Sequence, residues 1–229
     1  MKKLLIILLL FLNHSFSQSL FELDSAIEKI INKYKLIGLS ICVTLDNKII
    51  FEKYSGFADI KNKRLINDST CFRIASISKT VTGTAIMQLY ERGLINLDDD
   101  ISNYLGYKVK NPKYPDDIIT IRQLANHISS LNDGLGYSEF LNYAYSPNIP
   151  QIKDLLLPQG KFYTKDMWGN YKPGSKYSYC NAGYALLGTI VEKVTNMRFD
   201  LYCKKNIFEK LGMKSSFNID DINLNNIAV

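Results

Sequence analysis

The sequence is poor in the residues that bind transition metals. It has two histidines, His14 and His127, among 229 residues, and none of its four cysteines stand in a Cys-x-x-Cys pair. Zinc sites in proteins are built from several His and Cys ligands at short spacings. The sequence therefore argues against a zinc site.

A segregated patch of basic charge is also missing. Lys and Arg number 28 against 22 Asp and Glu, and the formal net charge is +6, but the lysines are scattered among acidic residues. Nucleic-acid-binding proteins gather their basic residues on one face or along one helix. We expect a solvated surface and no nucleic-acid partner. A hydrophobic content of 46% with 22% charged residues is that of an ordinary globular protein.

Long apolar runs are absent after the first residues. Leu4–Leu12 is an unbroken apolar stretch of nine residues, preceded by lysines at positions 2 and 3 and followed by serines at positions 15 and 17. Nine residues are too few to span a bilayer. A buried helix or a retained anchor is possible, but the order of features favours a signal peptide over residues 1–17, cleaved before Gln18. We therefore expect a secreted or periplasmic protein with no transmembrane segment.

The N-terminal half of the remaining chain predicts one helix and one hairpin. Apolar residues recur at helical spacing over 20–34. Two extended, β-branched segments at 38–45 and 48–54 flank Asp46-Asn47, which is typical turn chemistry, so a β-hairpin follows.

The rest of the chain predicts mainly helices. Apolar residues share one face over 76–92, before Gly93, and again over 181–194. Thr120 is placed to cap a short helix over 121–127, and 201–211 is a further candidate, ended by Gly212. The polar region 129–176 is too long for a plain loop and predicts irregular helices.

Ser76 and Lys79 stand at the start of the 76–92 segment. Residues three apart share a helix face, so Ser76 Oγ and Lys79 Nζ can meet there. An amine beside a hydroxyl can activate it as a nucleophile. Ser-x-x-Lys alone is a weak signal, since the two residues can equally be a helix cap and a surface lysine.

Tyr179 and Asn181 form a second candidate pair. Alternate residues of an extended segment point the same way, which places the phenol and the carboxamide on one side. A phenol near a lysine loses its proton more easily and can serve as a base. A carboxamide can orient both a lysine and a substrate amide, although Asn181 can also cap the following helix.

Together these segments resemble the serine β-lactamase and penicillin-binding-protein superfamily. The branch with class C β-lactamases, related D-alanyl-D-alanine carboxypeptidases and esterases is the most similar. The resembling segments are 38–43 (first core strand), 72–79 (nucleophile motif), 120–131 (a segment that often reads HTSGL), 173–188 (tyrosine motif) and 211–217 (an LGM turn). Within 120–131, Ser130 stands where glycine is usual.

The resemblance implies an α/β (α+β) fold with an antiparallel sheet flanked by helices and an all-helical subdomain. In residues 18–229 we expect a sheet and helix part over about 18–100 and a helical part over about 101–229. The resemblance further implies a secreted serine hydrolase with Ser76 as nucleophile and Lys79 and Tyr179 sharing the proton transfers. Asn181 would bind substrate, and the Ser76 N–H would be one of two oxyanion donors. The partner would be a β-lactam, a D-Ala-D-Ala peptide or an ester, and no cofactor or metal would be required.

One family motif is missing from the sequence. Neither Lys-Thr-Gly nor His-x-Gly occurs in the 229 residues. We therefore expect the chain to correspond to the N-terminal part of the family domain, without its C-terminal sheet strands. This keeps an alternative open, namely a catalytically incompetent truncated relic or a module that binds peptidoglycan peptides. A structural surface protein that merely uses the fold is a third, weaker alternative.

Overall fold

The computed structural model describes residues 22–143 and 149–229 and divides them into two compact units. The sheet unit comprises the described residues up to Arg73 together with Ile222–Val229, and the helical unit comprises Ile74–Asp221. The predicted signal peptide over 1–17 lies outside the described residues. The change of unit falls after Arg73, whereas the sequence placed the change from sheet to helices near residue 100.

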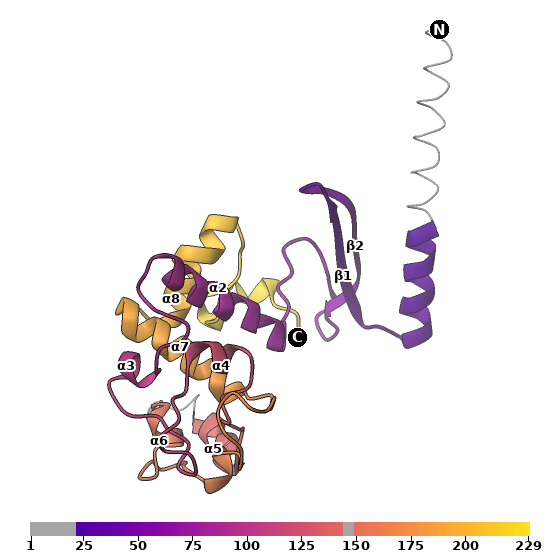
Figure 1. The fold of residues 1–229 in the computed structure, drawn as a ribbon. Coiled ribbons are helices and arrows are strands. Elements are labelled where there is room, and N and C mark those ends of the chain that lie inside the picture. Colours follow the sequence, from indigo (N-terminus) through magenta and orange to yellow (C-terminus); the bar gives the residue numbers. More distant parts are fainter. Residues whose placement is uncertain (1–21, 144–148) are drawn as a thin grey trace, which may run out of the picture. The chain divides into compact units, whose positions relative to one another are not determined.

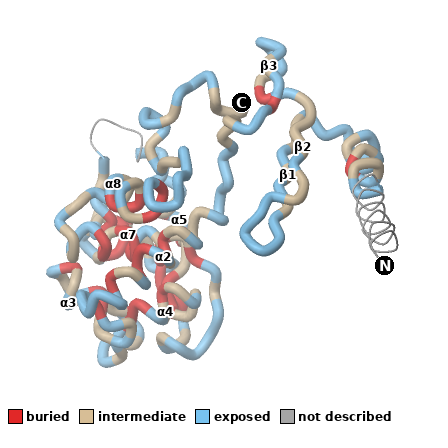
Figure 2. Tube along the Cα trace, turned by 90° about the horizontal axis from the view of Figure 1, so that it is seen from above, coloured by how far each residue is buried: buried red, intermediate tan, exposed pale blue. Residues whose placement is uncertain are grey.

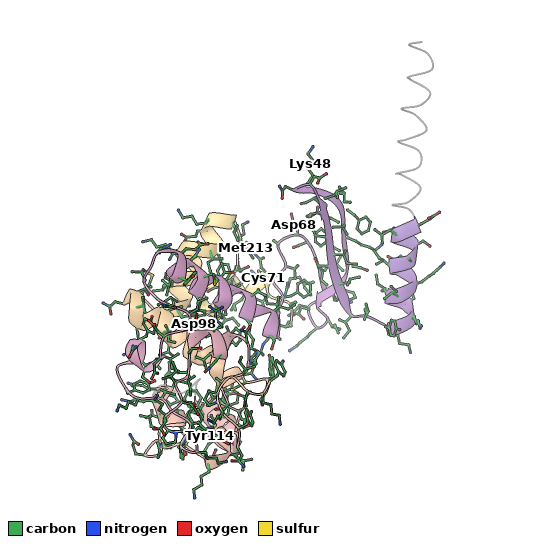
Figure 3. The ribbon with its side chains drawn as sticks, in the orientation of Figure 1. Lys48, Asp68, Cys71, Asp98, Tyr114 and Met213 are labelled. Atoms are coloured by element: carbon green, nitrogen blue, oxygen red, sulfur yellow. The ribbon has the colours of Figure 1, made fainter. Side chains whose placement is uncertain are left out.

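The sheet unit is built on one antiparallel hairpin (Figure 1). Residues 22–34 are helical, as predicted, and lead into strands β1 (Gly38–Leu45) and β2 (Lys48–Asp59). Asp46 and Asn47 both have left-handed backbone angles, which gives the tight turn that a two-residue hairpin needs. Lys48 lies at the tip of this hairpin (Figure 3).

The second strand is longer than predicted and gains a partner. It continues to Asp59 and pairs with the short strand β3 (Arg64–Leu65), which gives the order β1-β2-β3. The C-terminal residues return to this unit, where Val229 N–H donates to the Ala58 carbonyl (2.8 Å) and Ala228 N–H to the Cys71 carbonyl (3.0 Å). The predicted helical part therefore does not extend to residue 229.

The helical unit holds most of the buried residues (Figure 2). Its α-helices are α2 (Ser78–Glu91), α3 (Ser102–Leu105), α4 (Ile121–Ala125), α5 (Leu135–Tyr143), α6 (Lys153–Leu156), α7 (Asn181–Thr195) and α8 (Phe199–Cys203). Single turns of 3-10 helix cover Ala75–Ile77, Lys165–Met167, Glu209–Leu211 and Ile219–Asp221, with another at Leu224–Asn226 in the sheet unit, and Lys204–Phe208 is a π-helical turn.

Helix α7 is the centre of this unit. It contacts α2, α3, α4 and α8, and its inward side chains Leu186, Leu187 and Ile190 are fully buried. Burial of a Leu or Ile side chain stabilises a fold by about 1.5–3 kcal/mol, so this helix fixes the positions of its neighbours. The residues at its N-terminus are thereby held firmly against α2.

The predicted helices are largely confirmed, with differences at their ends. Thr120 caps α4 in a full capping box with Gln123. The 76–92 helix begins as a 3-10 turn, and the 201–211 helix is broken into α, π and 3-10 turns before Gly212, whose φ is 67°. Asn181 is not the cap of α7, since Cys180 occupies that position and its Sγ accepts from the Gly183 N–H (3.4 Å). No helix among the described residues is both long and apolar enough to cross a membrane.

Candidate active site

Ser76 lies at the kinked entry to α2. The preceding residue, Ala75, has a φ of 45°, a left-handed conformation that is unfavourable for a residue with a β-carbon. The 3-10 turn Ala75–Ile77 then runs directly into α2, and Ser76 is exposed. Residues in such sparsely populated conformations cluster at functional sites. The kink presents the Ser76 hydroxyl to solvent at the start of a helix.

Lys79 is one turn further along and contacts Ser76. Its Nζ donates to Ser76 Oγ (3.1 Å) and to Asn181 Oδ1 (2.7 Å). Lys79 is partly buried, and its Nζ also lies 4.8 Å from the centre of the Tyr179 ring. The i,i+3 meeting that the sequence predicted is present, and the amine has a second anchor on α7.

Tyr179 also contacts Ser76. Its hydroxyl lies 2.7 Å from Ser76 Oγ, and the residue is 44% exposed. The pKa of the Tyr179 phenol is lowered, first by hydrogen bonding with Lys79, then by hydrogen bonding with Ser76, and further by the Lys79 charge. A phenol whose anion is favoured in this way is a suitable base for the Ser76 proton.

Asp133 fixes the orientation of Asn181. Its Oδ2 accepts from the Asn181 main-chain N–H (3.0 Å) and from Asn181 Nδ2 (2.7 Å), and its Oδ1 accepts from the Ala182 N–H (2.9 Å). Because a carboxylate only accepts, the Asn181 amide must turn its NH₂ to Asp133 and its oxygen to Lys79. The carboxylate also lies at the N-terminus of α7, where negative charge is favourable.

His127 holds the strand-like segment that carries Tyr179. Its carbonyl accepts from the Ser178 N–H (2.8 Å), and its Nδ1 accepts from the Cys180 N–H (3.1 Å). Its ring lies 4.5 Å from the Tyr179 ring, centre to centre. The buried Cys180 turns its thiol toward Asp133 (3.3 Å), and burial raises the pKa of that thiol.

The structure brings all four sequence-predicted residues, Ser76, Lys79, Tyr179 and Asn181, into one hydrogen-bonded group within the helical unit. Sequence reasoning missed Asp133, which is 48 positions from Asn181 and has no local signal of a role. Trp168, the residue before Gly169, is buried at 3% exposure and packs in the core.

The contacts of Ser76 bear on what its hydroxyl can do chemically. Across the part of the chain that the structure describes, no cluster of three His, Cys, Asp or Glu residues could hold a metal ion. A hydroxyl in contact with an amine and with an acidified phenol can instead act as a nucleophile whose proton has an acceptor in place.

Comparison with known proteins identifies the family of the chain. The family model described as Beta-lactamase matches residues 23–223. Penicillin-binding protein 4* of Bacillus subtilis is 29% identical over 197 residues, which cover 85% of this chain and 41% of that protein. Protein flp of Staphylococcus aureus strain N315 is 28% identical over 195 residues, which cover 84% of this chain and 37% of that protein.

Solved structures show the same fold. The octameric penicillin-binding protein homologue from Pyrococcus abyssi superposes with a TM-score of 0.72 at 30% identity, covering 90% of this chain and 46% of that one. A class C beta-lactamase gives a TM-score of 0.65 at 21% identity, covering 90% of this chain and 52% of that one. The β-lactamase/transpeptidase fold class is thus confirmed, while the chain spans 37–41% of the length of these two curated relatives.

Proposed function

The chain belongs to the Beta-lactamase family, and from that premise we propose that it is a serine hydrolase that forms an acyl-enzyme on Ser76. The observation that carries the proposal is the double contact of Ser76 Oγ, with Tyr179 OH at 2.7 Å and Lys79 Nζ at 3.1 Å. The substrate would be a small molecule or peptide with an amide, β-lactam or ester carbonyl.

In the proposed acylation, Ser76 Oγ attacks the carbonyl carbon while its proton passes to the Tyr179 phenolate. The carbonyl oxygen becomes an oxyanion, which the N–H of Ser76 at the helix entry can stabilise. Collapse of this intermediate breaks the bond to the leaving group, which takes the proton from Tyr179. Lys79 lies beside the phenol, and its hydrogen bonding, together with its charge, lowers the pKa of Tyr179.

In the proposed deacylation, water attacks the Ser76 ester and gives its proton to the Tyr179 phenolate. The ester bond breaks, the acid product leaves, and Ser76 Oγ recovers a proton from Tyr179.

Asn181 supplies a carboxamide beside Lys79, and its Oδ1 already accepts a hydrogen bond from Nζ (2.7 Å). A substrate amide would therefore either replace this hydrogen bond or add a further one to the same group of side chains.

Covalent labelling tests the proposal directly. The chain is treated with a fluorescent fluorophosphonate and, separately, with a fluorescent penicillin, beside Ser76→Ala and the neighbouring control Ser78→Ala. We expect labelling of the wild type and of Ser78→Ala, and none of Ser76→Ala. Penicillin labelling would point to β-lactams or D-Ala-D-Ala peptides. A folded wild-type chain that takes neither label would overturn the proposal and favour the incompetent relic or the peptide-binding module.

Export is a separate part of the proposal. It rests on the lysine pair at positions 2 and 3, the apolar stretch Leu4–Leu12 and the serines at 15 and 17. We expect the mature protein outside the cytoplasm, in the periplasm or medium, with Gln18 as its first residue. Intact-mass measurement of the fractionated protein tests this, and a full-length mass in the cytoplasmic fraction would contradict it.

A further inference from the structure

His127 accepts hydrogen bonds from the backbone on both sides of Tyr179. The residue before Tyr179 donates its N–H to the His127 carbonyl (2.8 Å), and the residue after it donates its N–H to His127 Nδ1 (3.1 Å). The imidazole also stacks on the Tyr179 ring, with centres 4.5 Å apart and planes inclined by 35°. Three separate contacts therefore set where the Tyr179 phenol points.

The hydrogen bond from the Cys180 N–H to Nδ1 requires a neutral imidazole. Nδ1 can accept from the Cys180 N–H only if it carries no proton, which places the ring proton on Nε2. An imidazolium donates from both nitrogens, so protonation would place the Nδ1–H against the Cys180 N–H and break this hydrogen bond. His127 has a φ of 58°, a conformation that asparagine and glycine tolerate best, which limits the replacements that keep the backbone as it is.

The groups that face His127 bear on its charge in opposite directions. Burial lowers the pKa of His127 most, and the Lys79 charge lowers it further. Asp133 opposes these effects, since its negative charge favours the imidazolium. The rings of Tyr184 (5.1 Å) and Tyr177 (5.9 Å) complete its surroundings. The neutral form that the hydrogen bond from the Cys180 N–H needs is thus the form that the surroundings favour near neutral pH.

We propose that neutral His127 is a positioning residue for Tyr179, and that proton uptake by His127 releases Tyr179 from Ser76 and adds a second loss of Ser76 reactivity at acidic pH, beyond the loss caused by protonation of Tyr179. The inference rests on the proposed hydrolase function. It assigns His127 no proton transfer with substrate, because its Nδ1 is engaged by the main chain. The Tyr179 phenolate and His127 would each have to be free of a proton for the site to work.

The test is the pH dependence of fluorophosphonate labelling in wild type, His127→Asn and His127→Gly. Asparagine tolerates the backbone angle and offers an oxygen near the Nδ1 position, but it does not titrate. Glycine tolerates the angle and offers no acceptor.

We expect the logarithm of the wild-type labelling rate, plotted against falling pH, to decrease with a slope of one where Tyr179 titrates. Below the pKa of His127 the slope should become two. His127→Asn should retain the single slope, and His127→Gly should be at least about tenfold slower at every pH. Coincident wild-type and His127→Asn profiles, or a wild-type rate in His127→Gly, would overturn the proposal.

A second readout separates this inference from the proposed function. In ¹⁵N-labelled protein, imidazole and amide resonances are followed against pH by NMR. The imidazole signal that is missing from His127→Asn belongs to His127, which distinguishes it from any signal of His14. We expect Nδ1 to be the unprotonated nitrogen at neutral pH and the Cys180 amide to shift with the same midpoint as the imidazole. A Cys180 amide that does not move with His127 would overturn the positioning role. If no variant labels at any pH, the hydrolase proposal fails, and the NMR result still decides whether His127 holds Tyr179.

Discussion

Asp133 and Asn181 are joined by two hydrogen bonds that end on one carboxylate oxygen. Oδ2 of Asp133 accepts from the Asn181 main-chain N–H (3.0 Å) and from its Nδ2 (2.7 Å). This pairing decides which end of the Asn181 amide meets Lys79, whose Nζ then finds an oxygen at 2.7 Å. A residue that contacts neither Ser76 nor Tyr179 in the structure therefore sets the position of the amine that does.

We expect Asp133→Asn to lower the rate of Ser76 labelling by about tenfold or more, because small displacements of reacting groups reduce rates steeply. Four donors converge on the Asp133 carboxylate, and a carboxamide can offer only one oxygen to them. The matched control is Asp98→Asn, at a residue labelled in Figure 3, which removes the exposed ion pair with Arg122 in the same unit. Equal labelling rates in the two variants would contradict the prediction.

Lys79 is expected to control the ionisation of Tyr179. Because hydrogen bonding and charge from Lys79 lower the pKa of the phenol, Lys79→Met should raise that pKa toward its ordinary value near about 10. The measurement is the phenolate absorbance against pH, taken as the difference between each protein and its Tyr179→Phe partner, since the chain has 15 tyrosines. A Tyr179 midpoint that does not rise in Lys79→Met would rule out this coupling.

The sequence predicted the local parts of the site because their signals are local. Ser76 and Lys79 meet through helix periodicity, and Tyr179 and Asn181 share a side because alternate residues of an extended segment do. The hairpin turn at Asp46-Asn47 and the cap at Thr120 follow from the same short-range chemistry. Each of these depends on residues within four positions of one another.

The remaining parts depend on contacts between distant segments. Asp133 reaches Asn181 across 48 positions, and His127 reaches Cys180 across 53, so no periodicity reports either contact. Similarly, the return of residues 222–229 to the sheet unit is set by pairing with Cys71 and Ala58. Ser130 was noted as a replacement for glycine, but its buried hydrogen bond to Asn111 could not be foreseen.

Ser130 combines a left-handed backbone with a buried polar contact. Its φ is 63°, and its Oγ accepts from Asn111 Nδ2 (3.0 Å) in the core. We expect Ser130→Ala to lower the free energy of unfolding by about 1–3 kcal/mol, since it loses the hydrogen bond and keeps the backbone cost. Ser130→Gly should be more stable than Ser130→Ala by about 1 kcal/mol, because glycine adopts positive φ without that cost.

Urea unfolding followed by Trp168 fluorescence measures this difference, since Trp168 is the only tryptophan and is buried in the helical unit. Wild type is the reference for both variants. A Ser130→Ala protein as stable as Ser130→Gly would show that the backbone at this position carries no penalty.

The stability of the helical unit should depend on pH through His127. Its pKa in the folded protein is lowered, chiefly by burial and then by Lys79, below the ordinary value of 6.5. Above 6.5 both the folded and the unfolded chain hold a neutral imidazole, and the residue contributes nothing to the pH dependence. As the pH falls below that value, the unfolded chain takes up the proton first, so the free energy of unfolding decreases until the folded-state pKa is passed.

His127→Asn has no such group. We therefore expect the wild type to lose stability relative to His127→Asn as the pH falls below about 6.5, and to run parallel to it from about pH 7 to about pH 8. Urea unfolding of both proteins across this range, read from Trp168, gives the difference directly, and the other titrating groups cancel because both proteins carry them. Curves that stay parallel down to about pH 5 would mean that His127 takes up its proton equally well in the folded and unfolded chain, which its contact with the Cys180 N–H should not allow.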